Sequence, residues 1–238
     1  MNHVNTSDWY NSLRKEFKSN SLSIEQVSRR SEYWRKSNLD IVSGSVQDTS
    51  QIDLSYMKGT CLYEPDLTVH GDILELVGEN SYQVLSILDV IADEVSFAKD
   101  YFGRLEKASQ KLVPRPLARD NTLSPKVGYV FSFSDSLEKP LVIHNKTDAS
   151  ASSCFQRNLI VIEEDVEATI IETGNNLSVC NSVTEIYLGK NAKLNYLDLT
   201  GENNVFPKIS HKFCGMAEHS SFNHFGLRLN TKATRTEI

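Results

Sequence analysis

The chain repeats itself with a period of 26 residues over residues 157–199. The segment RNLIVIEEDVEATIIE starts at Arg157, and NSVTEIYLGKNAKLNYLDL follows it from Asn181. Each copy is an apolar strand, a short polar turn and a second apolar strand. The apolar positions coincide at a spacing of 26: Ile160 with Ile186, Ile162 with Leu188, Val166 with Ala192, Ala168 with Leu194, Ile170 with Tyr196 and Ile171 with Leu197. A short strand-turn-strand repeat is typical of stacked coils.

This repeat predicts the stacked coils of a parallel β-helix. Neighbouring coils would lie about 4.8 Å apart, so inward positions must be apolar. The turn at residues 189–192 fits, because glycine and asparagine tolerate the backbone angles of a tight corner. A pair of antiparallel hairpins in a sandwich is the alternative that spacing does not exclude.

A weaker third copy continues the repeat. At the same spacing, Gly189 falls on Gly215 and Tyr196 on Phe222. Glu218 then takes the place of Ala192, and an inward-facing glutamate is costly. We therefore expect a one-residue shift or a bulge in this copy.

The chain divides into an N-terminal region, residues 1–115, and a partial β-helix core, residues 116–238. The first region is predicted to be helical with a few short strands. We expect helices over residues 23–35 and 80–111 and short strands or loops over 44–77. A proline-rich linker at residues 113–116 leads to strands over 127–133 and 140–144.

Composition excludes several classes of function. The net charge is −6 and no basic block occurs, which argues against nucleic-acid binding. The first 25 residues hold no continuous apolar core and the longest apolar runs are short, so we predict no secretory signal, no membrane partner and a cytoplasmic location. The four cysteines form no C-x-x-C pair, unlike a disulfide scaffold or a structural zinc site.

Three groups of side chains are candidates for chemistry, although no catalytic residue is predicted. Cys154 and Cys180 are 26 residues apart, so the repeat places them on adjacent coils. Thiolates bind iron and iron–sulfur clusters, but such clusters usually take four ligands, and we favour two ordinary buried or loop thiols. His211, Cys214, His219 and His224 could hold a metal, yet strand alternation separates them, and solvent-facing histidines are favoured. Residues 163–165 with Glu167 form an acidic turn, for which a solvated corner is favoured over a calcium or iron site.

The repeated segments resemble the SufB/SufD family of iron–sulfur cluster assembly proteins, and most of all SufD. Family members carry an R-x-L-I-V strand, an acidic turn, a T-I-I-E strand and a T-E-I-x-L-G-x-N-A-x-L segment. The matching residues are Arg157, Leu159, Ile160, Val161, Glu172, Glu185, Gly189, Asn191 and Ala192. Residues 32–39 are similar to the family's E-x-W-R-Y-T-N-L segment, 139–141 to K-P-I and 235–238 to R-x-E-I.

The resemblance implies a mainly β fold with a helical N-terminal region and a right-handed parallel β-helix, which is incomplete here at its C-terminal end. It also implies a subunit that works through protein partners. SufD pairs with SufB through the β-helix, and each binds the ATPase SufC through a C-terminal region; iron–sulfur clusters or their precursors are handled only as part of that complex. Family members continue for many residues past position 238, so we expect a truncated gene product, an incomplete gene model or a fragment. The cluster residues of the family lie in that later part, and none is transferred here.

We therefore predict a non-catalytic scaffold or accessory subunit of a SufBCD-type complex, with a SufB-like subunit and a SufC-like ATPase as partners. A β-helical carbohydrate-active enzyme, such as a polysaccharide lyase, or an acyltransferase is the alternative from another class. The period of 26 is not a multiple of six, and no aromatic-lined carboxylate cleft is visible in the sequence. A non-functional remnant of SufD is the third possibility.

Overall fold

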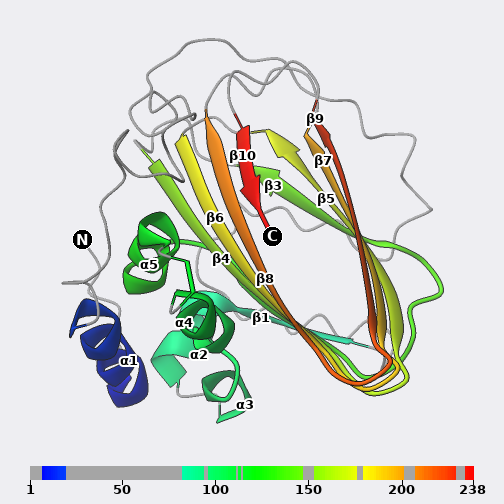
Figure 1. The fold of residues 1–238 in the computed structure, drawn as a ribbon, viewed down its shortest axis with the longest axis horizontal. Helices are drawn as coiled ribbons and strands as arrows, with labels where there is room; N and C mark the ends of the chain where they lie inside the picture. Colours follow the sequence, from blue (N-terminus) through cyan, green and yellow to red (C-terminus); the bar gives the residue numbers. More distant parts are fainter. Residues whose placement is uncertain are drawn as a thin grey trace.

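A computed structural model of the protein describes residues 7–19, 82–93, 96–110, 112–113, 115–146, 153–175, 179–200, 207–228 and 234–238 (Figure 1). The predictions for residues 23–35 and 44–77 lie outside these ranges. The helices are α1 (Asp8–Ser19), α2 (Ile87–Asp93), α3 (Ser96–Lys99), α4 (Arg104–Gln110) and α5 (Pro116–Leu123). The strands are β1 (Tyr82–Ser86), β2 (Tyr129–Phe133), β3 (Leu141–Lys146), β4 (Ser153–Ile162), β5 (Glu167–Asn175), β6 (Val179–Leu188), β7 (Lys193–Thr200), β8 (Lys208–Met216), β9 (Ser221–Arg228) and β10 (Thr234–Glu237).

The strands form two facing sheets between which the chain alternates. One sheet has the order β1-β2-β4-β6-β8-β10 and the other β3-β5-β7-β9. Every pairing from β2 onward is parallel, and only β1 runs antiparallel to its neighbour β2. The predicted stacking of successive repeats is confirmed, and the alternative of antiparallel hairpins is wrong.

The strand register confirms the period of 26 and corrects the third copy. Ile160 lies opposite Ile186, and Ile170 lies opposite Tyr196. In the next coil, however, Tyr196 lies opposite His224 rather than Phe222, a spacing of 28. An even shift keeps every side chain on its face, whereas the predicted one-residue shift would have turned the strand over. Glu218 consequently falls in an exposed turn and not in the core.

Three tight turns stack at the end where the two sheets converge (Figure 1). Asp165, Asn191 and His219 hold equivalent left-handed positions there, with φ of 61°, 57° and 59°. Asn191 therefore adopts the left-handed backbone angles expected for this tight turn. Gly189 is needed for a different reason, namely space. A Cβ on it would lie 2.7 Å from the backbone nitrogen of Glu164, so glycine permits the close approach of adjacent turns.

The main hydrophobic core lies between the two sheets. Ile160, Ile162 and Ile186 from the six-stranded sheet meet Ile170 and Leu194 from the other sheet, and all are buried. A second core covers the outer face of the six-stranded sheet, where α1 to α5 lie (Figure 1). None of the described helices is long and apolar enough to cross a bilayer.

The single helix predicted over residues 80–111 is wrong. Its first part is strand β1, which extends the six-stranded sheet beside β2, so pairing at a sheet edge overrides helical spacing. The rest divides into α2, α3 and α4. Gly103, with φ of 76°, separates α3 from α4. The predicted strands over residues 127–133 and 140–144 correspond to β2 and β3.

Candidate functional site

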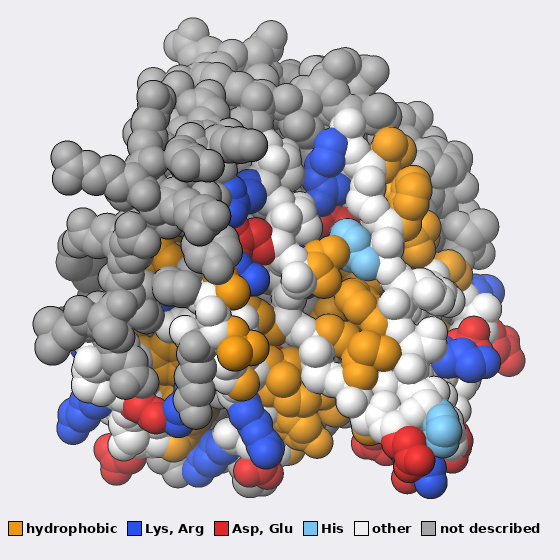
Figure 2. Space-filling view, viewed as in Figure 1, with side chains coloured by type: hydrophobic (Ala, Val, Ile, Leu, Met, Phe, Trp, Pro, Cys, Tyr) orange, Lys and Arg blue, Asp and Glu red, His pale blue; other side chains and the backbone are white. Residues whose placement is uncertain are grey.

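The space between the sheets changes from apolar to charged along the strands. Near the tight turns the inward side chains are aliphatic, whereas farther along the same strands they are Gln156, Ser182, Lys208 and Lys212 from one sheet and Glu172 and Asp198 from the other. Figure 2 shows basic, acidic and histidine side chains side by side next to an apolar region. The charged residues Glu172, Asp198, Lys208, Lys212 and Arg228 form the candidate functional site, which we call the charged array.

Two carboxylates and three cations make up its centre. Glu172 of β5 and Asp198 of β7 are register partners. Lys208 Nζ lies 3.1 Å from Glu172 Oε1 and 4.0 Å from Asp198 Oδ1. Lys212 Nζ lies 2.9 Å from Asp198 Oδ2 and 3.6 Å from Glu172 Oε2. Arg228 of β9 lies 2.7 Å from Asp198 Oδ2, so the pairs join both sheets into one network.

Neutral groups complete the hydrogen bonding of Glu172. The Tyr196 hydroxyl donates to its Oε2 at 2.6 Å, and Asn145 Nδ2 donates to its Oε1 at 2.8 Å. Gln156 Nε2 in turn donates to Asn145 Oδ1 at 2.7 Å. Because buried charges are stable only when paired and hydrogen-bonded, these contacts explain how Glu172 remains ionised inside the protein.

The electrostatics favour the charged forms of Glu172, Asp198 and Lys208. Burial opposes ionisation of Glu172, but Lys208 and Lys212 hold its pKa below the ordinary value. The same two cations, with Arg228, overcome burial and lower the pKa of Asp198. Burial likewise opposes the charge on Lys208, and the two carboxylates raise its pKa. A general acid or base works best with a pKa near the working pH, so these groups form a fixed array of charges and not a proton relay.

Cys154 and Cys180 meet beside this array, as the repeat predicted. They are register partners on β4 and β6, and Lys208 of β8 is the register partner of Cys180. Cys180 is buried and Cys154 is half-buried, and both are free thiols. Among the residues that the structure describes, no group of three or more His, Cys, Asp and Glu side chains could hold a metal ion.

The second candidate group, His211, Cys214, His219 and His224, is dispersed. Cys214 packs against the core between the sheets, and burial raises its pKa to about 11. His219 is exposed in the last tight turn. His224 stacks on Tyr196 with ring centroids 6.0 Å apart, and burial lowers its pKa. The expectation of solvent-facing histidines is therefore right for His219 but not for His211, which is buried.

His211 instead helps to hold the last strand. Its Nδ1 lies 3.2 Å from Oε2 of Glu237, its register partner on β10. Arg115, just before α5, and Arg235 also contact the Glu237 carboxylate, each at 2.5 Å. Burial opposes ionisation of Glu237, but His211 and the two arginines hold its pKa at about 2. These contacts fasten β10 to the body of the protein.

The acidic turn is a solvated corner, as favoured from the sequence. Glu163, Glu164, Asp165 and Glu167 are all exposed. Asp165 Oδ1 accepts a hydrogen bond of 2.7 Å from Asn191 Nδ2 of the next turn. The contacts of Asp165 thus serve the stacking of the turns.

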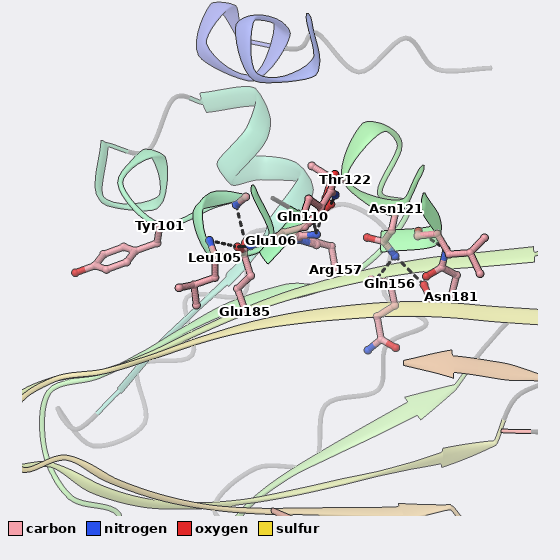
Figure 3. A network of polar contacts seen from close by, with 12 residues as sticks. Tyr101, Leu105, Glu106, Gln110, Asn121, Thr122, Gln156, Arg157, Asn181 and Glu185 are labelled. Atoms are coloured by element: carbon pink, nitrogen blue, oxygen red, sulfur yellow. Dashed lines mark hydrogen bonds and ion pairs between the residues drawn. The ribbon is translucent and has the colours of Figure 1, made fainter. Parts of the chain in front are cut away.

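A separate buried network fastens the helices to the six-stranded sheet (Figure 3). Arg157 of β4 is fully buried and points toward the helices. Its guanidinium lies 2.7 Å from Glu106 Oε2 and 2.6 Å from Glu185 Oε2, and it donates to Thr122 Oγ1 at 2.6 Å. The guanidinium also stacks over the Phe102 ring, 4.8 Å from its centroid.

Glu185 is the point at which α4 joins β6. It accepts hydrogen bonds from the backbone nitrogens of Gly103 at 2.6 Å, Leu105 at 2.9 Å and Glu106 at 3.1 Å. These donors belong to the first turn of α4, where backbone N–H groups have no partner within the helix. The network therefore has a structural role, and sequence reasoning identified Arg157 and Glu185 only as parts of a resemblance.

Sequence reasoning missed the charged array altogether. The available signal was polar residues at inward positions of strands whose other inward residues are aliphatic, as at Glu172 in TIIE and Asp198 in LDL. To recognise that these residues meet Lys208 and Lys212, the register of β8 must also be known. The repeat spacing of 26 residues misplaces β8 by two residues, because the observed spacing is 28.

One comparison with known proteins identifies part of the chain. Residues 143–238 match the family model described as SUF system FeS cluster assembly, SufBD core domain. No curated protein matches the chain. The matched segment runs from within β3 through β10, so it contains β5, β7 and β9 of the four-stranded sheet and most of β3. Residues 143–238 are thus similar to the SufBD core domain of iron–sulfur cluster assembly by the SUF system.

Proposed function

We propose that this chain is a non-catalytic scaffold or accessory subunit of a SufBCD-type complex that assembles iron–sulfur clusters. The observation that carries the proposal is the match of residues 143–238 to the SufBD core domain. In this proposal the partners are a SufB-like subunit and a SufC-like ATPase, and clusters or their precursors are cargo of the complex. The location would be the cytoplasm.

We further infer that the two sheets are the faces of a right-handed parallel β-helix. Parallel pairing at a spacing of 26 or 28 residues supports this inference, because each coil contributes one strand to each sheet. The division into an N-terminal region, residues 1–115, and a partial core, residues 116–238, stays a prediction. Among family members we favour SufD over SufB, on the resemblance of the strands that begin at Arg157.

The last described coil is the surface that we expect a partner to cover. β9 is the outermost strand of the four-stranded sheet. Phe225 and Leu227 on β9 are 57% and 41% exposed, and Met216 at the end of β8 is 52% exposed. An edge strand with exposed apolar side chains is a favourable site for association. These residues support a protein partner at this end of the core.

Co-purification tests this function directly. The chain is expressed with tagged SufB-like and SufC-like proteins of the same organism, and we expect the SufB-like protein to retain it. The change Phe225→Asp should weaken this retention at least about tenfold, because it places a charge in a desolvated contact.

The control variant makes the same kind of change on the helical side of the molecule. Leu112 is 84% exposed, and Leu112→Asp should leave retention unchanged. If neither SUF protein retains the unaltered chain, the proposed function is wrong. Equal loss in both variants would place the contact somewhere other than β9, and retention by a SufD-like protein in place of a SufB-like one would reverse the assignment to SufD.

A further inference from the structure

Cys154 and Cys180 form a pair of thiols beside the buried cation Lys208. They are register partners on adjacent parallel strands, which lie about 4.8 Å apart, and both side chains belong to the face between the sheets. Paired positions of this kind lie within the Cα separation that a disulfide spans. Cys154 is half-buried, whereas Cys180 is 1% exposed.

A buried cation lies beside this pair. Lys208 of β8 is the register partner of Cys180, and its Nζ lies 3.1 Å from Glu172 Oε1 and 4.0 Å from Asp198 Oδ1. The other two cations, Lys212 and Arg228, pair with Asp198. A nearby cation favours the charged form of a thiol, so Lys208 favours a thiolate at this pair.

Cys154 is the group that can provide this anion. A hydrogen bond from Cys180 lowers its pKa further than burial raises it, and the charge of Lys208 lowers it again. The pKa of Cys180 is raised by the same hydrogen bond, by burial and by the charge on Cys154. The two thiols thus differ: Cys154 is half-buried and the more acidic of the pair, whereas Cys180 is buried and the less acidic.

We propose that Cys154 and Cys180 are a redox-active dithiol that reacts with low-molecular-weight disulfides, with Cys154 as the attacking nucleophile and Cys180 as the resolving thiol. The Cys154 thiolate attacks one sulfur of the disulfide RSSR, the S–S bond breaks, and RS⁻ leaves. Cys180 then gives up its proton and attacks the Cys154 sulfur, which releases the second RS⁻. The proton passes to one of the two released thiolates. The Cys154 thiolate and the Cys180 thiol are oxidised to one disulfide, and RSSR is reduced to one thiol and one thiolate.

Cys214 is the matched control within the same protein. It is also a half-buried thiol that packs against the core between the sheets, but burial alone raises its pKa to about 11. The reduced, unaltered chain is treated with iodoacetamide at pH 7, and alkylation of each cysteine is followed by peptide mass spectrometry. Cys154 should react about tenfold faster than Cys214 or more, because the thiolate is the reactive form.

Oxidised glutathione then tests the second step. We expect a disulfide between Cys154 and Cys180, with Cys214 left as a free thiol. Cys180→Ala should stop the reaction at a glutathione adduct on Cys154, and Cys154→Ala should leave Cys180 unmodified. Lys208→Met should slow alkylation of Cys154 several-fold, since it removes the nearest cation.

The measurements on the unaltered chain are sufficient to accept or reject the proposal, so a variant that fails to fold does not affect the conclusion. Alkylation of Cys154 no faster than that of Cys214 would overturn the proposal. So would a disulfide that joins either cysteine to Cys61, or no disulfide at all. The dithiol does not depend on the proposed scaffold function: no SUF protein is present in these reactions, and a failed co-purification leaves their result unaffected.

Discussion

Replacing Arg157 by methionine should be among the most destabilising single changes in the described part of the chain. The guanidinium is fully buried and lies between two fully buried carboxylates, Glu106 and Glu185. Methionine fills a similar apolar volume, so the loss of packing is small. What remains is two buried carboxylates without the cation that pairs with them.

Removal of Arg157 does not affect the two carboxylates equally, and this difference determines the expected loss of stability. Glu185 keeps its three backbone N–H donors from the first turn of α4. Among the described residues, Glu106 keeps Thr122 and Gln110 as hydrogen-bond partners. Breaking a buried pair costs about 3–5 kcal/mol, so we expect Arg157→Met to lower the free energy of unfolding by about that amount at pH 7.

The loss should depend on pH in a defined direction. Burial already raises the pKa of Glu106 above 4.5, against the opposing effect of Arg157. Without Arg157 the folded-state pKa rises further, so the folded protein binds a proton that the unfolded chain has released. Stability of the variant relative to the parent therefore falls as pH rises through the parent's folded-state pKa of Glu106, which lies above 4.5, and the loss is larger at pH 7 than at pH 5.

Urea unfolding at pH 5 and pH 7 measures these differences. The matched control is the double variant Arg157→Met with Glu106→Gln, in which the uncompensated charge is gone. It should regain at least about 1–2 kcal/mol over the single variant at pH 7. A single variant that loses less than about 1 kcal/mol, or a double variant no more stable than the single one, would refute this account of the network.

Two further changes test other contacts. Glu237→Gln should lower stability by about 1–3 kcal/mol at pH 7; because the folded-state pKa is about 2, the contribution of Glu237 is present above its ordinary pKa of 4.5 and is lost as pH falls toward 2. Unfolding followed from pH 7 down to pH 2 should thus bring parent and variant together in acid, and a constant difference would contradict the ion-pair role. Gly189→Ala should cost about 1–3 kcal/mol in urea unfolding, because its Cβ would meet the backbone of the preceding turn at 2.7 Å. In Gly226→Ala, the control, the nearest atom lies at 3.5 Å, and equal losses in both would rule out steric contact as the cause.

The sequence predicted those parts of the fold that depend on local repetition. Ile160, Ile186 and their neighbours recur at a fixed spacing, and each strand pairs with the strand one coil away, so the register of β4 to β7 followed from spacing alone. The same logic placed Cys154 beside Cys180. It failed from β8 onward because two additional residues changed the spacing, and an alignment of short apolar segments cannot detect where they enter.

The remaining parts depend on contacts that are distant in sequence. Residues 82–86 have helical spacing of apolar side chains, yet they pair with β2, because the edge of an existing sheet offers more hydrogen bonds and burial than an isolated turn of helix. Glu172 and Lys208 are far apart along the chain, and their pairing appears only after the coils are stacked. The charged array was therefore invisible to motif reasoning, although each of its residues is present in the printed sequence.

The two additional residues in the last full coil reveal how this architecture varies in length. From Thr173 to Cys180 the chain advances seven residues, and from the equivalent Leu199 to Lys208 it advances nine, whereas the tight turns on the opposite side keep the same length. The turns on one side of the stack thus have a constant length, whereas the connections on the other side vary in length and accept insertions. Homologous chains can diversify in those connections without disturbing the inward-facing side chains, so sequence differences between relatives should concentrate there.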